Sequence, residues 1–208
     1  MVKQLLNSFL ILTLIFIDVP CKSQDVDSTF NKGKEQFEIG NYSTALNYFN
    51  QTIHLQKNHS KVYYIAGIAS YNLKDFKQAK KYFKKELTVN PKNINAFVFK
   101  AKSKSQLGKN RSALNDLKKA LKIDPSNVLV LLEKSNILFT QKKYTKAIQA
   151  YLKVNSLSPK TEIVYYKLGF CEYYLNHNTD ACNYWSKLED IDDFENYETI
   201  IKTCKLTN

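Results

Sequence analysis

Glycine, proline and histidine are scarce in this chain, and their scarcity excludes several kinds of active site. The 208 residues include five glycines, four prolines and three histidines. The glycines stand singly, so the chain has neither a glycine-rich phosphate loop nor a Gly-x-Ser-x-Gly nucleophile motif. His54, His59 and His177 do not fall at the short spacings that metal ligands need. We therefore expect no enzyme activity, cofactor, metal or small-molecule substrate.

Acidic residues are also few, with 19 Asp and Glu against 31 Lys and Arg, which gives a formal charge of +12. The lysines are spread along the chain, and charge distributed in this way mostly serves solubility. No nucleic-acid-binding motif accompanies it, so we expect no nucleic-acid partner. An anionic glycan or nucleic acid held by the lysine-rich surface stays an alternative. The one acidic run, residues 189–195, lacks the alternation of a calcium loop and is predicted to be solvated.

Residues 1–23 are predicted to be a signal peptide outside the fold. Lys3 gives a positively charged start, and residues 5–17 are almost wholly apolar but too short for a comfortable membrane span. Cys21 and Ser23 place small residues at the −3 and −1 positions of a cleavage site. We therefore expect an exported protein, periplasmic, associated with an outer membrane or secreted.

Cys21 leaves an alternative open, because a cysteine after an apolar segment can carry the lipid of a bacterial lipoprotein. Pro20 argues against lipidation, since the lipoprotein motif has a small residue immediately before the cysteine. A retained, uncleaved signal segment is the third possibility. We expect contact with a membrane only if Cys21 is lipidated or the signal segment is retained.

A unit of 34 residues, clearest at residues 60–93, recurs along the chain without an intervening Gly, Ser or Pro linker. Its first helix is predicted over 61–73 and its second over 76–89, where Asn90-Pro91 ends it because proline has no backbone N–H. Three positions recur at this period: a small residue in the first helix (Gly33, Gly67, Ala101, Ser135, Gly169), alanine in the second (Ala45, Ala79, Ala113, Ala147, Ala181) and a large residue after it (Phe49, Phe83, Leu117, Tyr151, Trp185).

This pattern resembles the tetratricopeptide repeat (TPR) family, whose 34-residue unit is a helix-turn-helix. The resemblance implies an all-α, right-handed α-solenoid in which each unit contacts its neighbours. We expect five units over residues 26–193, followed by a capping helix and tail over 194–208. The units are 26–59, 60–93, 94–127, 128–161 and 162–193.

The resemblance also implies a binding surface, because the first helices of such arrays line a groove that commonly holds an extended peptide or a partner helix. The predicted groove residues are Lys34, Phe37, Tyr64, Ile68, Tyr71, Lys102, Asn136, Phe139, Tyr166, Phe170 and Tyr173. Aromatic rings supply large contact areas at low entropic cost. The alternative is that several of these rings simply pack between units.

The C-terminal segment resembles that of exported bacterial TPR proteins, which often have an alanine-cysteine near a tryptophan and a second cysteine on the closing helix. This resemblance implies a disulfide between Cys182 and Cys204, which an oxidising compartment allows. Cys171 is then expected to be a buried free thiol.

These features together predict a non-catalytic protein–protein interaction scaffold of the cell envelope or secreted space, with a protein or peptide partner. Two alternatives remain: a lipid-anchored subunit of an envelope assembly, and a binder of an anionic polymer through the basic surface.

Overall fold

The computed structural model describes residues 18–59, 61–188 and 196–204, and all regular structure within these ranges is α-helical. The predicted all-α class is confirmed. Residues 1–17 of the expected signal peptide, the acidic run 189–195 and the tail 205–208 lie outside the described residues. The last part of the expected signal peptide, from Asp18, is the start of the first described helix. Cleavage after Ser23 remains a prediction.

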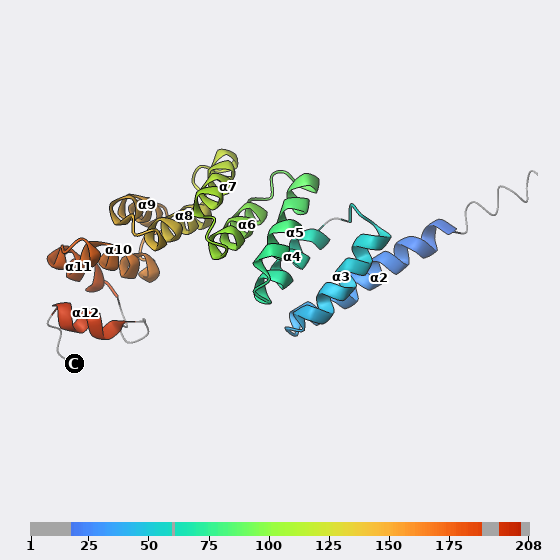
Figure 1. Ribbon diagram of the computed structural model, residues 1–208, viewed down its shortest axis with the longest axis horizontal. Helices are drawn as coiled ribbons and strands as arrows, with labels where there is room; N and C mark the ends of the chain where they lie inside the picture. The colour runs from blue at the N-terminus through green and yellow to red at the C-terminus, as the bar shows by residue number, and fades with distance from the viewer. Residues whose placement is uncertain (1–17, 60, 189–195, 205–208) are drawn as a thin grey trace, which may run out of the picture. The chain divides into compact units, whose positions relative to one another are not determined.

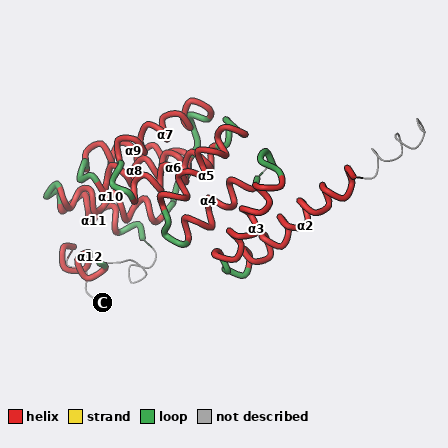
Figure 2. The backbone as a smooth tube through the Cα atoms, turned by 45° about the vertical axis from the view of Figure 1, so that its right-hand side comes forward, coloured by secondary structure: helices red, strands yellow, loops and turns green. Residues whose placement is uncertain are grey.

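The helices follow one another in pairs joined by short turns (Figures 1 and 2). Their bounds are α2 Asp18–Glu38, α3 Tyr42–Leu55, α4 Val62–Asn72, α5 Phe76–Val89, α6 Ile94–Gln106, α7 Asn110–Ile123, α8 Val128–Thr140, α9 Tyr144–Leu157, α10 Glu162–Tyr174, α11 Asn178–Trp185 and α12 Tyr197–Cys204. The helices predicted over 61–73 and 76–89 correspond to α4 and α5. Among the described residues, no helix is both long and apolar enough to cross a membrane.

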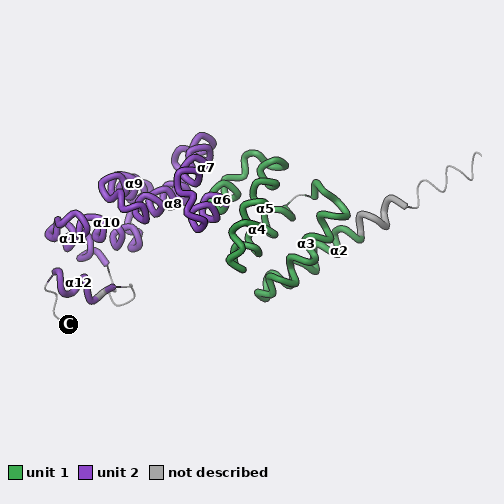
Figure 3. Tube along the Cα trace, viewed as in Figure 1, with its two compact units in different colours: residues 1–99 green, residues 100–208 purple. Residues whose placement is uncertain are grey.

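The chain divides into two compact units, residues 1–99 and 100–208, with the boundary inside α6 (Figure 3). We describe each unit by itself. In unit 1, helices α2 and α3, α3 and α4, and α4 and α5 pack on one another. In unit 2, contacts run from α7 through α8, α9 and α10 to α11 and α12. Each helix therefore packs mainly on its neighbours in sequence, as expected for stacked repeats.

A left-handed residue follows the first helix of every pair. Gly40, Lys74, Gly108, Lys142 and Asn176 all have positive φ, between 57° and 83°, and they are spaced by 34 residues. The left-handed conformation lets the chain leave one helix and enter the next within a few residues. Glycine adopts it without cost, whereas the two lysines do so with steric strain at Cβ.

Side-chain caps fix the start of several helices. The Asp75 side chain accepts a hydrogen bond from the Gln78 amide at 3.0 Å, at the start of α5. The Asn127 side chain accepts one from the Val130 amide at 3.2 Å, at the start of α8. These caps satisfy amide groups that have no partner inside the helix.

The recurring small residues face the recurring large ones within a helix pair. A Cβ atom added to Gly67 of α4 would lie 2.6 Å from Phe83 Cε1 on α5, and one added to Gly33 of α2 would lie 2.6 Å from Phe49 Cε1 on α3. A Cβ on Gly169 would collide with the Trp185 indole. Phe49, Phe83 and Trp185 are each fully buried, so the rings have no room to move away.

The last helix, α12, completes the core of unit 2. Ile200 is fully buried in a cluster with Phe170, Trp185 and Leu188. The Trp185 indole N–H donates to the Tyr166 carbonyl at 3.2 Å, which ties α11 to α10. Apolar side chains of α12 thus cover a core face that would otherwise be exposed to water.

Candidate functional site

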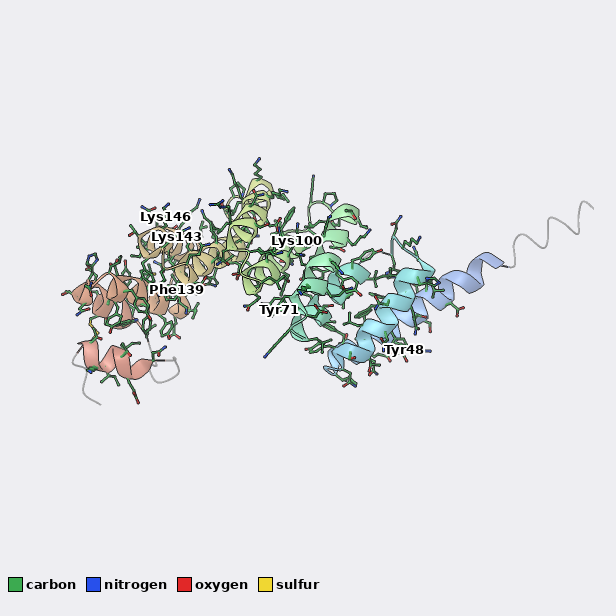
Figure 4. The ribbon with its side chains drawn as sticks, viewed as in Figure 1. Tyr48, Tyr71, Lys100, Phe139, Lys143 and Lys146 are labelled. Carbon is green, nitrogen blue, oxygen red and sulfur yellow. A yellow bond between two sulfur atoms is a disulfide. The ribbon has the colours of Figure 1, made fainter. Side chains whose placement is uncertain are left out.

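One continuous surface runs over the first helices of unit 2, and its residues define what we call the first-helix stripe: Lys102, Glu133, Asn136, Phe139 and Lys167. Lys102 Nζ on α6 lies 3.8 Å from Glu133 Oε2 on α8. Lys167 Nζ on α10 lies 4.9 Å from the centre of the Phe139 ring on α8, within range of a cation–π interaction. Phe139 is labelled in Figure 4. Because each contact joins one first helix to the next, the stripe spans α6, α8 and α10.

The polar part of the stripe is held in place from below. Burial raises the pKa of the Glu133 carboxyl, while Lys102 and a hydrogen bond from Asn136 act in the opposite direction. Asn136 Oδ1 accepts a hydrogen bond from the Tyr151 hydroxyl on α9 at 2.7 Å. The amide and the carboxyl, both only partly exposed, therefore have fixed positions from which they can meet the backbone groups of a peptide.

An aromatic cluster continues the stripe at the C-terminal ends of α8 and α10 and the start of α9. The Tyr144 and Tyr174 rings stack with centroids 4.9 Å apart, and Phe139 meets Tyr144 edge-on at 5.8 Å. Tyr174 is 49% exposed. Tyr144 and Tyr174 were absent from the sequence-based prediction because Tyr144 begins a second helix, α9, and Tyr174 is the last residue of α10.

Three predicted groove residues of unit 2 pack on the core instead. Tyr166 and Phe170 are each only 5% exposed, and Phe170 meets the Trp185 ring edge-on at 4.9 Å. Tyr173 is half-buried, with its ring 6.0 Å from Trp185. Tyr166 and Phe170 are buried in the cluster that contains the Trp185 indole, so their predicted position on an open groove face is wrong.

In unit 1 the predicted groove residues are mostly packed between helices. Tyr64, Ile68 and Tyr71 of α4 pack against the cluster that contains Phe83. The Tyr71 ring lies edge-on to Phe76 at 5.2 Å. Phe37 of α2 packs in a similar way on Tyr42 and Phe49, and Lys34 is exposed. Tyr64 and Tyr71 also contact Phe99 of the next repeat, which is the packing between units that the alternative interpretation described, whereas Phe37 packs within its own repeat.

The cysteines show one bridge and one buried thiol. Cys182 on α11 and Cys204 on α12 form a disulfide, with Cα atoms 5.5 Å apart. This is the pair that the family resemblance implied. Cys171 is free and buried, and burial raises the pKa of its thiol to about 12. A thiol protonated at neutral pH is a poor nucleophile, which argues against a catalytic role for Cys171.

A buried ion network in unit 2 had no signal in the repeat pattern. Asp116 on α7 is 3% exposed, and its carboxylate lies 3.1 Å from Lys100 Nζ and 2.5 Å from Lys104 Nζ, both on α6. Burial lowers the pKa of Lys100, and Asp116 opposes that shift. The two ammonium groups compensate the buried carboxylate, so the network joins α6 to α7 and has a structural role.

Glu172, His177 and Asp180 also come together, with ligand atoms within 4.8 Å of one another. The turn between α10 and α11 brings them together, although their sequence spacing is not that of a metal motif. His177 Nδ1 lies 2.9 Å from Glu172 Oε2, and His177 and Asp180 are exposed. An exposed carboxylate–imidazole pair is adequately explained as a surface interaction, and we assign no metal to it.

Comparison with known proteins places these helices in a family. Tetratricopeptide repeat models match residues 60–93 and 100–160. No curated protein matches the chain. Three solved structures illustrate the fold. MamA 41-end from Desulfovibrio magneticus RS-1 has a TM-score of 0.72 and 22% identity, with 78% of this chain and 92% of that chain covered.

The two other structures are similar over most of their length. PilW, described as a widely conserved type IV pilus biogenesis factor, has a TM-score of 0.73 and 16% identity, covering 88% of this chain and 87% of its own. YrrB, described as a TPR protein with an unusual peptide-binding site, has a TM-score of 0.68 and 18% identity, covering 89% and 98%. With the helix pairs and the 34-residue register, these matches show that the chain contains tetratricopeptide repeats and has an α-solenoid fold.

Proposed function

We propose that the chain is a non-catalytic protein-interaction scaffold that binds a peptide or helix of a partner protein along the first-helix stripe. The observation that carries the proposal is the continuity of the stripe over α6, α8 and α10, through the contacts of Lys102 with Glu133 and of Lys167 with Phe139. The tetratricopeptide repeats support a protein or peptide partner, and the peptide-binding site named in the description of YrrB is consistent with it.

The chemistry of the stripe suits a peptide better than a small molecule. Lys102, Glu133 and Asn136 offer donors and acceptors that can orient a backbone, and the adjacent rings of Phe139 and Tyr174 offer an apolar surface for one or two side chains. Interfaces concentrate their binding energy in such aromatic anchors with polar groups around them. Because the rings are already packed on one another, little side-chain entropy is lost on binding.

Cross-linked affinity capture from the native cell-envelope fraction, followed by mass spectrometry, tests this proposal. Phe139→Ala and Lys102→Glu should each reduce recovery of the partner, by about tenfold if the residue is a hot spot. Lys118→Glu is the matched control, because this exposed lysine lies on the second helix α7. Recovery that is unaffected by both stripe variants, or that falls equally with the control, would contradict the proposal.

We also propose that the mature protein is exported and starts at Gln24. The apolar segment 5–17 and the small residues at the cleavage site support this. Intact-mass measurement of the protein from its native source gives the answer. We expect the mass of a chain that starts at Gln24. The added mass of a fatty-acyl group on Cys21 would instead establish the lipid-anchored alternative, and the mass of the uncleaved chain would indicate a retained anchor.

A further inference from the structure

A hollow of about 590 Å³ lies between α3 and α5 in unit 1, outside the first-helix stripe, and we call it the α3–α5 hollow. Its apolar part consists of the buried Tyr63 and Tyr82 and the half-buried Ile53. The exposed side chains around it are those of His54, Lys57, Lys81 and Lys85. The volume falls within the range of protein ligand sites.

Two hydrogen bonds hold the walls of the hollow. The Tyr82 hydroxyl on α5 donates to Asn50 Oδ1 on α3 at 2.5 Å. The Tyr63 hydroxyl on α4 donates to the Lys57 carbonyl at 2.7 Å. Both tyrosines are less than 9% exposed. The hollow is therefore formed in advance of any ligand, which reduces the entropic cost of binding.

The charge around the hollow has one sign. No carboxylate occurs among the described residues that line it. Helix α5 carries five lysines, and its single acidic residue, Glu86, is 3% exposed and accepts a hydrogen bond from Asn93 at 2.8 Å. Helix α3 has no acidic residue. The exposed side chains that these two helices contribute are thus positively charged or neutral, which favours an anionic ligand.

The same part of the repeat is hollowed again in unit 2, in a smaller site of about 340 Å³ lined by α8 and α9. A shift of two repeats places Lys153 at the position of Lys85 and Lys146 at that of Gln78. Apolar Leu131 and Ala150 take the positions of the two tyrosines, and the described lining again has no carboxylate. One lysine next to an apolar surface therefore recurs at the same repeat position, that of Lys85 and Lys153, whereas Lys81 corresponds to Gln149.

We propose that the α3–α5 hollow binds an acidic peptide segment in which an apolar side chain is flanked by carboxylates. The apolar side chain fills the space over Ile53 and Tyr82, and the carboxylates pair with Lys57, Lys81 and Lys85. The hollows do not suit nucleic acid, because single-stranded bases need exposed rings to stack on. The two tyrosines are buried, and the unit 2 hollow is lined by aliphatic side chains instead. This second site is independent of the first-helix stripe.

Fluorescence anisotropy with the full-length chain and a labelled peptide, in which one phenylalanine lies between runs of glutamate, tests the proposal. All variants carry Lys146→Glu and Lys153→Glu, so that the unit 2 hollow does not contribute. Adding K81E and K85E should weaken binding about tenfold, since two charge pairs become repulsive. The matched control adds K77E and K84E, which make the same charge change at exposed positions of α5 outside the hollow, and should weaken binding less than about threefold.

Three outcomes would overturn the proposal. Equal losses in the two variants would mean that only the total charge of α5 matters. Equal binding of a peptide with serine in place of phenylalanine would show that the apolar part of the hollow is not used. Stronger binding of a sulfated oligosaccharide or an oligonucleotide of the same charge would identify an anionic polymer as the ligand. Far-UV circular dichroism of each variant verifies that the helices remain folded.

Discussion

Replacing Gly67 by alanine tests whether close contact between the two helices of a pair sets the repeat pattern. An alanine Cβ would lie 2.6 Å from Phe83 Cε1, and Phe83 is fully buried. Overpacking a core costs about 1–3 kcal/mol. Alanine in place of glycine inside a helix gains about 1 kcal/mol. We therefore expect Gly67→Ala to lower the free energy of unfolding by about 1 kcal/mol, despite the better helix former.

The natural sequence suggests the matched rescue. One repeat later, Ala101 stands at the position of Gly67 and Leu117 at that of Phe83, so a larger residue in the first helix accompanies a smaller one in the second. Phe83→Leu alone should cost about 1–2 kcal/mol through the cavity it leaves. In the double variant the alanine methyl group occupies part of that cavity. The double variant should be more stable than additivity predicts, by about 1 kcal/mol.

Urea unfolding followed by far-UV circular dichroism gives the four free energies of this cycle. A coupling energy below about 0.5 kcal/mol would refute the reasoning, because independent sites add within that margin. An increase in stability on Gly67→Ala in the natural background would refute it too. That result would mean that Phe83 moves aside freely and that helix propensity alone determines the change in stability.

Three further predictions concern turns and charges. Gly108→Ala should lower stability by about 1 kcal/mol and Lys142→Gly should raise it by a similar amount in thermal unfolding, because both residues have positive φ. Asp116→Asn should cost about 3–5 kcal/mol in urea unfolding, because it leaves two ammonium groups without their buried partner. Glu133→Gln should stabilise the protein at pH 7, because the pKa of Glu133 is raised in the folded state. The protonated carboxyl contributes its full stabilisation below about pH 4.3, and this contribution to the free energy of unfolding is lost as the pH rises and the carboxyl ionises. The benefit should vanish in acid.

The 34-residue period located the helices well because it reports packing. Small residues must face large ones in every helix pair, so Gly67 with Phe83 and Gly169 with Trp185 reveal the pairs without any structure. The turns were only partly visible. Gly40 and Gly108 indicate a left-handed residue because glycine favours that conformation. Lys142 has the same conformation, but lysine does not indicate it. At Lys142 the packing of the surrounding helices imposes the left-handed conformation, although lysine does not favour it.

The candidate site was harder to predict, because the register of a repeat gives the face of a side chain but not its partner. Register places Tyr166 and Phe170 on the first-helix face, yet the indole of Trp185 accommodates both rings in the core. Asp116 occupies a core position and is tolerated because two lysines from α6 reach it. Such pairings depend on distances between helices, which a single sequence does not contain.

The two proposed binding surfaces can be separated because they lie on different helices of different compact units. Phe139→Ala changes the surface of α8, and the Lys81 and Lys85 exchanges change the surface of α5, so each should affect its own ligand alone. Gly67→Ala instead loosens the packing of α4 on α5, and both of these helices contribute residues to the lining of the α3–α5 hollow. This variant should weaken the binding of the acidic peptide in proportion to the loss in the free energy of unfolding. A surface variant that lowered binding and stability together would therefore belong to the core rather than to a site.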